Sequence, residues 1–176
     1  MGKNKALLEF RGKPLIQHQI EILSLLFEEI IIGSNDPAPY APFGLRVVPD
    51  LLSERCALTG IHALLESSCH ERVFVVACDM PYLHETLIES FLHFPTEYDV
   101  IVPESDRGPE PLHAVYRKSC LPAIEAAAAR GAWKVTDFYD SLRVDHPRVR
   151  DKDWSIEGHS PFLNVNTPDE WRTAGP

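Results

Sequence analysis

The sequence has few cysteines and no long hydrophobic run. Its four cysteines contain no C-x-x-C pair, and a chain of 176 residues can bury a core without disulfide bonds, so we expect free thiols in a reducing compartment. No apolar stretch approaches the length of a membrane span, and the first residues lack the apolar segment of a signal peptide. The sequence therefore predicts a soluble, cytoplasmic protein without membrane contact.

Positive charge is also scarce. The chain has 17 Lys and Arg against 26 Asp and Glu, with a formal net charge of -9. Nucleic-acid binding requires a basic surface, so this balance argues against a nucleic-acid partner. It does not exclude a phosphorylated small ligand, because only the charge at the pocket matters there. The ordinary content of 44% hydrophobic and 24% charged residues predicts one globular domain spanning residues 1–176.

The most apolar stretch, residues 73–78, ends at a carboxylate. Six apolar residues without a break predict a central strand that is buried on both faces of a parallel α/β sheet. Asp79 then falls at the carboxyl end of that strand, where open α/β sheets bind ligands, and Pro81 ends the strand in a loop. A carboxylate in this place suits Mg²⁺. Alternatively, Asp79 caps the following helix or tightens the turn.

Helical and strand patterns alternate along the chain. We expect helices over residues 15–27, 58–65, 83–92, 119–130 and 134–142. We expect strands over residues 29–32, 45–48, 73–78, 98–102, 112–116, 143–145 and 162–166, with polar loops at 36–44, 103–110 and 147–160. Residues 167–170 form a capping box with proline at the first helical position, which predicts a C-terminal helix. This order predicts an α/β fold with a mostly parallel sheet.

Polar side chains recur where the predicted strands end. They are Asn35, Asp50, Asp79, Asn164 and Asn166. Because the carboxyl ends of parallel strands meet at one edge of a sheet, we expect these side chains to converge on a site. Alternatively, Asn35 is an Asx-turn residue that tolerates a left-handed conformation.

The N-terminal segment is basic in an otherwise acidic chain. This segment contains only one acidic residue, Glu9. Its basic residues are Lys3, Lys5, Arg11 and Lys13. One interpretation is a solvated tail, and the other is a lysine cluster that binds phosphates as point charges. With Lys5 and Lys13 near the polar strand ends, the crevice suits a nucleotide with Mg²⁺.

Several stretches occur in an order and spacing that together resemble one family. They are residues 1–8 (MGKNKALL), 12–16 (GKPLI), 34–35 (SN), 48–50 (VPD) leading to 58–61 (LTGI), 78–81 (CDMP), 111–116 (PLHAVY) and 164–168 (NVNTP). This set resembles the molybdenum cofactor guanylyltransferases, which are MobA-like nucleotidyltransferases with a Rossmann-like, three-layer fold. The resemblance spans nearly the whole chain.

The resemblance implies transfer of GMP from Mg²⁺-bound GTP to molybdopterin, with release of pyrophosphate. It implies that Asp79 holds Mg²⁺ and that Lys5 acts with it in catalysis by binding the nucleotide phosphates. Lys13 is assigned to nucleotide binding from its place in the basic N-terminal segment. The attacking phosphate is already ionised at neutral pH, so the reaction needs charge neutralisation and positioning rather than a general base. The resemblance also implies transient contact with molybdenum cofactor biosynthesis proteins or molybdoenzymes.

The same resemblance implies roles for five further residues. Asn35, Asp50 and Gly60 would line the base and ribose of the nucleotide. Gly60 lies near a helix start, where glycine is unfavourable unless something approaches the backbone closely. Asn164 and Asn166 would lie near the metal and the pterin phosphate.

Two departures from the family pattern keep alternatives open. Cys56 and Ala57 replace the usual Gly-Pro of the guanine-side loop, which leaves transfer of CMP, or transfer to another phosphorylated acceptor, as an alternative. The family's opening strand and glycine-rich loop do not precede Met1, so we expect the first strand of the sheet to be missing and this chain to be a poor catalyst. The strands beside it would then close the gap, leave their edges exposed or recruit a substitute.

Two other classes of protein compete with an enzyme. One is a non-catalytic nucleotide-binding remnant, whose activity is lost with the glycine-rich loop. The other is a receiver-like domain with Asp79 as the phosphoacceptor. The basic N-terminus disfavours the receiver, because receivers need a cluster of acids near the first strand.

Overall fold

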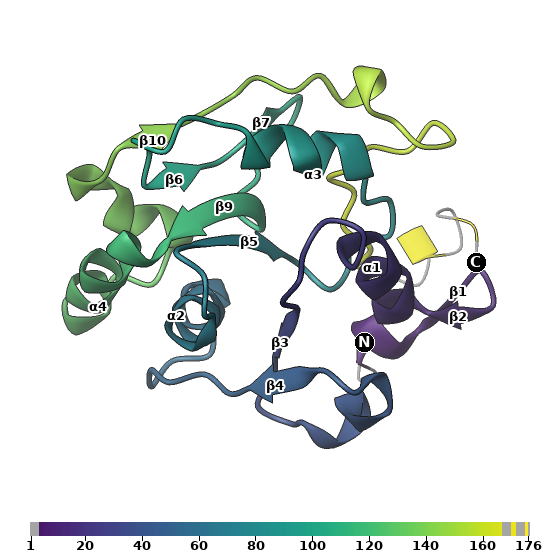
Figure 1. Cartoon of the computed structure of the whole chain (residues 1–176), viewed down its shortest axis with the longest axis horizontal. Helices are drawn as coiled ribbons and strands as arrows, with labels where there is room; N and C mark the ends of the chain where they lie inside the picture. The colour runs from purple at the N-terminus through teal and green to yellow at the C-terminus, as the bar shows by residue number, and fades with distance from the viewer. Residues whose placement is uncertain (1–3, 167–169, 172–174, 176) are drawn as a thin grey trace.

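The computed structural model describes residues 4–166, 170, 171 and 175 of the chain (Figure 1). Its largest sheet has the strand order β10–β6–β9–β5. These strands are β10 (Val144–Asp145), β6 (Val100–Ile101), β9 (His113–Arg117) and β5 (Arg72–Val76). β9 runs antiparallel to both β5 and β6, and β10 runs parallel to β6. The sheet is therefore mixed rather than mostly parallel.

A second, parallel sheet contains β3 (Ile31–Gly33) and β4 (Arg46–Val48). Within the described part of the chain, β3 pairs only with β4 and β5 pairs only with β9, and β3 lies apart from β5 in Figure 1. A cavity of about 510 Å³ separates the two strands and is lined by residues 28–31 on one side and 70–76 on the other. We call this space the β3–β5 gap. One edge of β3 and one edge of β5 thus have no strand partner among the described residues.

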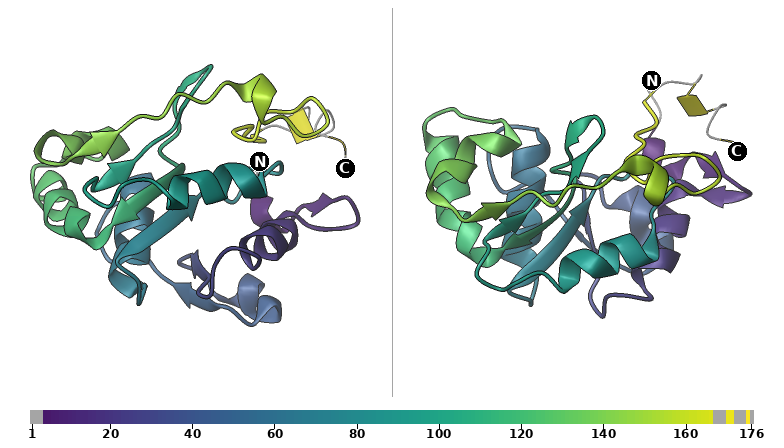
Figure 2. Two further views of the ribbon diagram at one scale, coloured as in Figure 1. Left: turned by 45° about the horizontal axis from the view of Figure 1, so that its top comes forward. Right: turned by 90° about the horizontal axis from the view of Figure 1, so that it is seen from above.

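Helices cover both faces of the four-stranded sheet (Figures 1 and 2). Helices α2 (Ala57–Ser67) and α4 (Leu121–Ala129) pack on one face, and α1 (Leu15–Leu23) and α3 (Glu85–Leu92) pack on the other. Side chains alternate along β9, so that Tyr116 is buried with α2 and α4 while its neighbour Val115 is buried with α3. These layers confirm the predicted Rossmann-like α/β fold.

Short elements complete the chain. Two antiparallel hairpins join β1 (Glu9–Phe10) to β2 (Lys13–Pro14) and β7 (Glu104–Ser105) to β8 (Gly108–Pro109). Five described 3₁₀ helices are η1 (Lys5–Leu7), η2 (Ala38–Phe43), η3 (Lys118–Cys120), η4 (Val135–Ser141) and η5 (Asp151–Asp153). In the first hairpin, Arg11 and Gly12 both have positive φ, at 51° and 81°. That backbone matches a two-residue type I′ turn, which favours glycine at the second position.

Several expected elements differ from the structure. Residues 162–166 do not form a strand, because no described strand lies beside them, although the Val165 N–H donates to the Asp79 carbonyl at 2.9 Å. The expected loop 103–110 contains the β7–β8 hairpin, and the expected α-helix over 134–142 is the 3₁₀ helix η4. β5 is less buried than predicted, because its unpaired edge borders the β3–β5 gap.

Three further expectations concern the chain ends and the thiols. Glu170 and Trp171 are helical, but residues 167–169 of the predicted capping box lie outside the described residues. All four cysteines are free, as predicted. No helix in the described ranges is long and apolar enough to cross a membrane.

Candidate functional site

Asp79 lies on a loop that is fixed by two other segments of the chain. The carboxylate follows the end of β5 by three residues. Gln19 of α1 is only 4% exposed, and its amide nitrogen donates to the carbonyls of Ala77 at 2.8 Å and Met80 at 2.9 Å. On the other side, the Asp79 carbonyl accepts the N–H of Val165 at 2.9 Å. These bonds hold the backbone on both sides of Asp79, so the carboxylate has a defined position.

Three segments far apart in sequence meet at this carboxylate. The Lys5 ammonium donates to Asp79 Oδ2 at 3.1 Å and to Asn166 Oδ1 at 2.6 Å. Lys5 is held by η1, which Asn4 caps by accepting the Ala6 N–H at 3.2 Å. We call this group the Lys5–Asp79–Asn166 cluster. Its charged side chains are partly exposed, at 29% for Lys5 and 18% for Asp79, so a ligand has access to them.

Asn35 and Asp50 form a second polar pair at the ends of β3 and β4. Asn35 Nδ2 donates to Asp50 Oδ2 at 2.6 Å, and the Asp50 N–H donates back to Asn35 Oδ1 at 2.9 Å. The parallel pairing of β3 with β4 explains why these two side chains meet. Asp50 Oδ1 has no hydrogen-bond partner among the described residues.

Gly60 lies in the first turns of α2. A Cβ atom added there would meet no atom within 4 Å, so its backbone faces open space. With Ala57 and Cys78 it lines a cavity of about 240 Å³ that also reaches Gly33 at the end of β3. The open space beside Gly60 is consistent with close approach of a ligand to this backbone.

The last two candidate residues, Lys13 and Asn164, form their contacts outside the Lys5–Asp79–Asn166 cluster. Lys13 forms an ion pair with Glu21 on α1. Asn164 Nδ2 makes a long, 3.5 Å contact with the Phe162 carbonyl.

Gln19 was missed by sequence reasoning, although a signal was present. It falls three residues after Ile16 and four before Leu23, on the apolar stripe of α1. A single amide on such a stripe is typical of a buried side chain that satisfies backbone groups.

His113 belongs to the core rather than to the site. Its ring is fully buried in edge-to-face contact with Phe74, Phe91 and Phe162, and neither ring nitrogen has a hydrogen-bond partner among the described residues. Burial lowers the pKa of His113 to about 3. The ring is therefore neutral at physiological pH and takes no part in proton transfer.

The donor atoms around Asp79 define the chemistry that this place supports. Carboxylate and amide oxygens from Asp79 and Asn166 are hard ligands, which suit a hard divalent cation. The ammonium of Lys5 already lies between those two oxygens, so the cluster accepts positive charge. A cation and a lysine at the end of β5 provide the positive charge that a polyphosphate requires.

Solved structures share this architecture. The 2-C-methyl-D-erythritol 4-phosphate cytidylyltransferase of Thermus thermophilus matches with a TM-score of 0.70 at 14% identity, covering 97% of this chain and 91% of that chain. The molybdopterin-guanine dinucleotide biosynthesis protein A of Archaeoglobus fulgidus matches with a TM-score of 0.77 at 26% identity, covering 98% and 89%. The fold is therefore that of the Rossmann-like nucleotidyltransferases.

The sequence comparisons give the family. The chain belongs to the MobA-like NTP transferase domain family, which it matches over residues 1–146. A probable molybdenum cofactor guanylyltransferase from Pelotomaculum thermopropionicum is 37% identical over 170 residues, which cover 97% of this chain and 83% of the relative. The molybdenum cofactor guanylyltransferase of Desulfosudis oleivorans is 33% identical over 177 residues, covering 98% and 86%. These matches confirm the family predicted from the motifs.

Proposed function

We propose that this protein transfers GMP from Mg²⁺-bound GTP to molybdopterin, releases pyrophosphate and so forms the guanine dinucleotide cofactor. The named relatives and the family membership support this activity. The observation that carries the proposal is the Lys5–Asp79–Asn166 cluster, in which three distant segments present one ammonium and two hard oxygens at a strand end.

Asp79 is the proposed metal ligand, with Asn166 beside it. Bound Mg²⁺ would neutralise phosphate oxygens and orient them for displacement. Lys5 supplies a second positive charge next to Asp79 and binds the nucleotide phosphates. Gln19 keeps the Asp79 loop in place. The phosphate that attacks is ionised at neutral pH, so no residue of the chain has to remove a proton.

Asp50 is the proposed selector of the base. Guanine presents an N1–H and an exocyclic amine, and both donate hydrogen bonds. Asp50 Oδ1 is available to accept them, because Asn35 occupies only the other carboxylate oxygen. The open backbone at Gly60 gives the nucleoside room to approach.

Lys13 and Asn164 complete the proposed set. Lys13 would contribute to nucleotide binding after leaving Glu21, and Asn164 would lie with Asn166 near the pterin phosphate. We propose that residues 1–176 act as one domain, with GTP and molybdopterin as substrates and with transient contacts to molybdenum cofactor biosynthesis proteins or molybdoenzymes.

The direct test is product formation. The chain is incubated with molybdopterin and Mg²⁺ together with GTP or CTP, and the dinucleotide and pyrophosphate are quantified. The proposal expects equal amounts of the guanine dinucleotide and pyrophosphate, with GTP the faster donor. Absence of product with either nucleotide would contradict the activity, and equal or faster use of CTP would assign the protein to cytidylyl transfer.

A further inference from the structure

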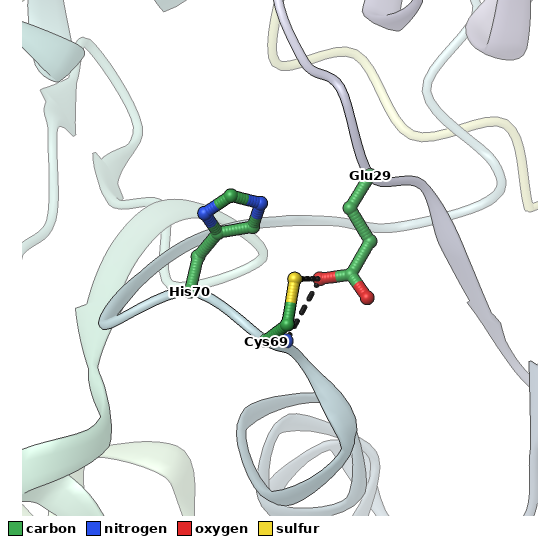
Figure 3. Close-up of side chains that lie close together, drawn as sticks. All are labelled: Glu29, Cys69 and His70. Carbon is green, nitrogen blue, oxygen red and sulfur yellow. Dashed lines mark hydrogen bonds between the residues drawn. The ribbon is translucent and has the colours of Figure 1, made fainter.

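A second group of potential metal ligands lies at the end of β5 opposite to Asp79. Figure 3 shows the Cys69 sulfur directed at the Glu29 carboxylate, with the His70 ring beside them. One ligand atom from each of these three side chains lies within 4.8 Å of the other two. Glu29 Oε2 accepts the Cys69 thiol at 3.4 Å and the Cys69 N–H at 3.0 Å. We call this group the Glu29–Cys69–His70 cluster.

The backbone around this cluster is well fixed. Ser68 is the C-cap residue that follows α2, and its N–H donates to the Leu64 carbonyl at 3.0 Å. The Ser68 hydroxyl donates to Glu29 Oε2 at 2.8 Å and accepts the His70 N–H at 3.1 Å. One hydroxyl therefore orders both the carboxylate and the backbone that carries the two other ligands, as supporting hydrogen bonds do in metal sites.

The cluster also has a distinct place in the fold. Glu29 precedes β3 by two residues, and Cys69 and His70 lie in the link between α2 and β5. Glu29 and His70 line the β3–β5 gap. The cluster thus lies at the amino-terminal ends of β3 and β5, whereas Asp79 follows the carboxyl end of β5.

The donor set of this cluster favours zinc. One thiol, one imidazole and one carboxylate match the sulfur, nitrogen and oxygen ligands of Zn²⁺, which accepts three protein ligands and one water. In a tetrahedral zinc site the ligand atoms lie about 3.3–3.6 Å apart, from bond lengths of about 2.0–2.3 Å. The distance of 3.4 Å between Cys69 Sγ and Glu29 Oε2 already matches this spacing. Mg²⁺ is disfavoured here because it requires oxygen ligands.

We propose that Glu29, Cys69 and His70 bind a zinc ion that fastens β3 to β5 at their amino-terminal ends. Binding forms a zinc–sulfur bond, and the thiol proton of Cys69 is released to solvent. Within the described residues these two strands share no backbone pairing, so the ion would strengthen a connection that here consists of the hydrogen bonds from Ser68 and Cys69 to Glu29. Because an ion that binds only the folded state raises its stability, zinc should protect the chain against unfolding.

Cobalt provides a direct probe of this site. The chain is stripped with a chelator and titrated with Co²⁺, whose bond to a thiolate gives a charge-transfer absorption band, and Zn²⁺ is then added. We expect a band that saturates at one equivalent and disappears when zinc displaces cobalt, together with a higher Tm in zinc. Both Cys69→Ser and His70→Asn should weaken zinc binding by more than about tenfold, and Cys69→Ser should abolish the band.

Two matched variants make the test specific. Cys78 is the other exposed cysteine, and Cys78→Ser should keep the band, as should His93→Asn at an exposed histidine. The His70 side chain is exposed, so His70→Asn should fold normally. No band in the parent chain, a band that survives Cys69→Ser, or a band lost in Cys78→Ser would overturn the proposal.

Discussion

Two clusters beyond opposite ends of β5 carry different kinds of ligand atoms. Asp79 and Asn166 offer only oxygens and have a lysine between them. Glu29, Cys69 and His70, at the other end, offer oxygen, sulfur and nitrogen. The first set suits Mg²⁺, which keeps several waters and binds substrate phosphates, and the second suits Zn²⁺, which binds with tetrahedral geometry.

The two clusters are also assembled in different ways. Lys5, Asp79 and Asn166 come from three segments and meet only when the chain has folded. Cys69 and His70 are adjacent in sequence and need only Glu29 to complete their group. Open α/β sheets bind ligands at the carboxyl ends of their strands, and this general rule locates the first cluster from the sequence. No comparable rule locates the second cluster.

The largest expected effect is on catalysis at the Asp79 end. Asp79→Asn removes the charge of the proposed metal ligand while keeping its size. We expect GMP transfer to fall about a hundredfold or more, since the metal and its ligand stabilise the transition state. Initial rates with saturating Mg²⁺ and GTP measure this. Asp140→Asn, at an exposed aspartate on η4, is the matched control, and near-normal turnover in Asp79→Asn would refute the assignment.

The support for the Asp79 loop gives the next largest effect. Gln19→Leu removes two donors and leaves the carbonyls of Ala77 and Met80 without them. We expect a loss of about 2–3 kcal/mol in the free energy of unfolding, measured by urea denaturation, with reduced GMP transfer. Gln17→Leu, on the same helix, should have a small effect. The loop follows the carboxyl end of β5, whereas the Glu29–Cys69–His70 cluster lies at its amino end. Weaker zinc binding in Gln19→Leu, alongside reduced GMP transfer, would show that the two clusters are not independent.

The next prediction concerns His113, which lies on β9 beside β5. Its pKa in the folded protein, about 3, lies below the ordinary value of 6.5, so below pH 6.5 the unfolded chain binds a proton that the folded chain does not. Stability is therefore present in full above pH 6.5 and is lost as the pH falls towards 3, by about 2 kcal/mol at pH 5.

The corresponding variant is His113→Phe, which suits an aromatic environment. Its urea unfolding between pH 5 and 7 should lose about 2 kcal/mol of the pH dependence of the parent. Chelator is present throughout, so that loss of zinc does not contribute. An unchanged pH dependence in His113→Phe would contradict the neutral, buried state of the ring.

The smallest expected effect concerns the base. Asp50→Asn replaces one carboxylate oxygen by an amide group, which donates hydrogen bonds. Guanine presents two donors to this residue, so the new amide group cannot form hydrogen bonds with them. We expect GTP binding to weaken by about 1.5 kcal/mol, roughly tenfold, with little change for CTP. Calorimetry with both nucleotides measures this. A parallel loss for GTP and CTP would mean that Asp50 does not read the base.

Much of the fold was predictable because its elements follow local patterns. The apolar run before Asp79 predicts β5, and the spacing of Leu15, Ile16 and Ile20 predicts α1. Residues 162–166 alternate like a strand, but strand formation depends on a neighbour, and sequence alone does not reveal its absence. The mixed pairing of β9 was missed for the same reason, since strand direction depends on distant partners.

The site was predictable only in part. Asp79 and Lys5 were expected in one region because a strand end and a basic segment are visible in sequence, and the two side chains do meet. The contact of Lys13 with Glu21 was not foreseen, because it depends on how the β1–β2 hairpin turns the chain onto α1. Glu29 joins Cys69 from a distant part of the chain, at a separation where no local spacing indicates a metal site.

The most direct test of the account is to locate the catalytic cation. Mn²⁺ replaces Mg²⁺ in the complex with GTP, and paramagnetic broadening of backbone amide signals is measured by NMR in the parent chain and in Asp79→Asn. We predict that broadening is strongest at Asp79, Val165 and Asn166 and is lost in Asp79→Asn. Broadening centred on Cys69 and His70, or broadening that persists unchanged in Asp79→Asn, would contradict the account.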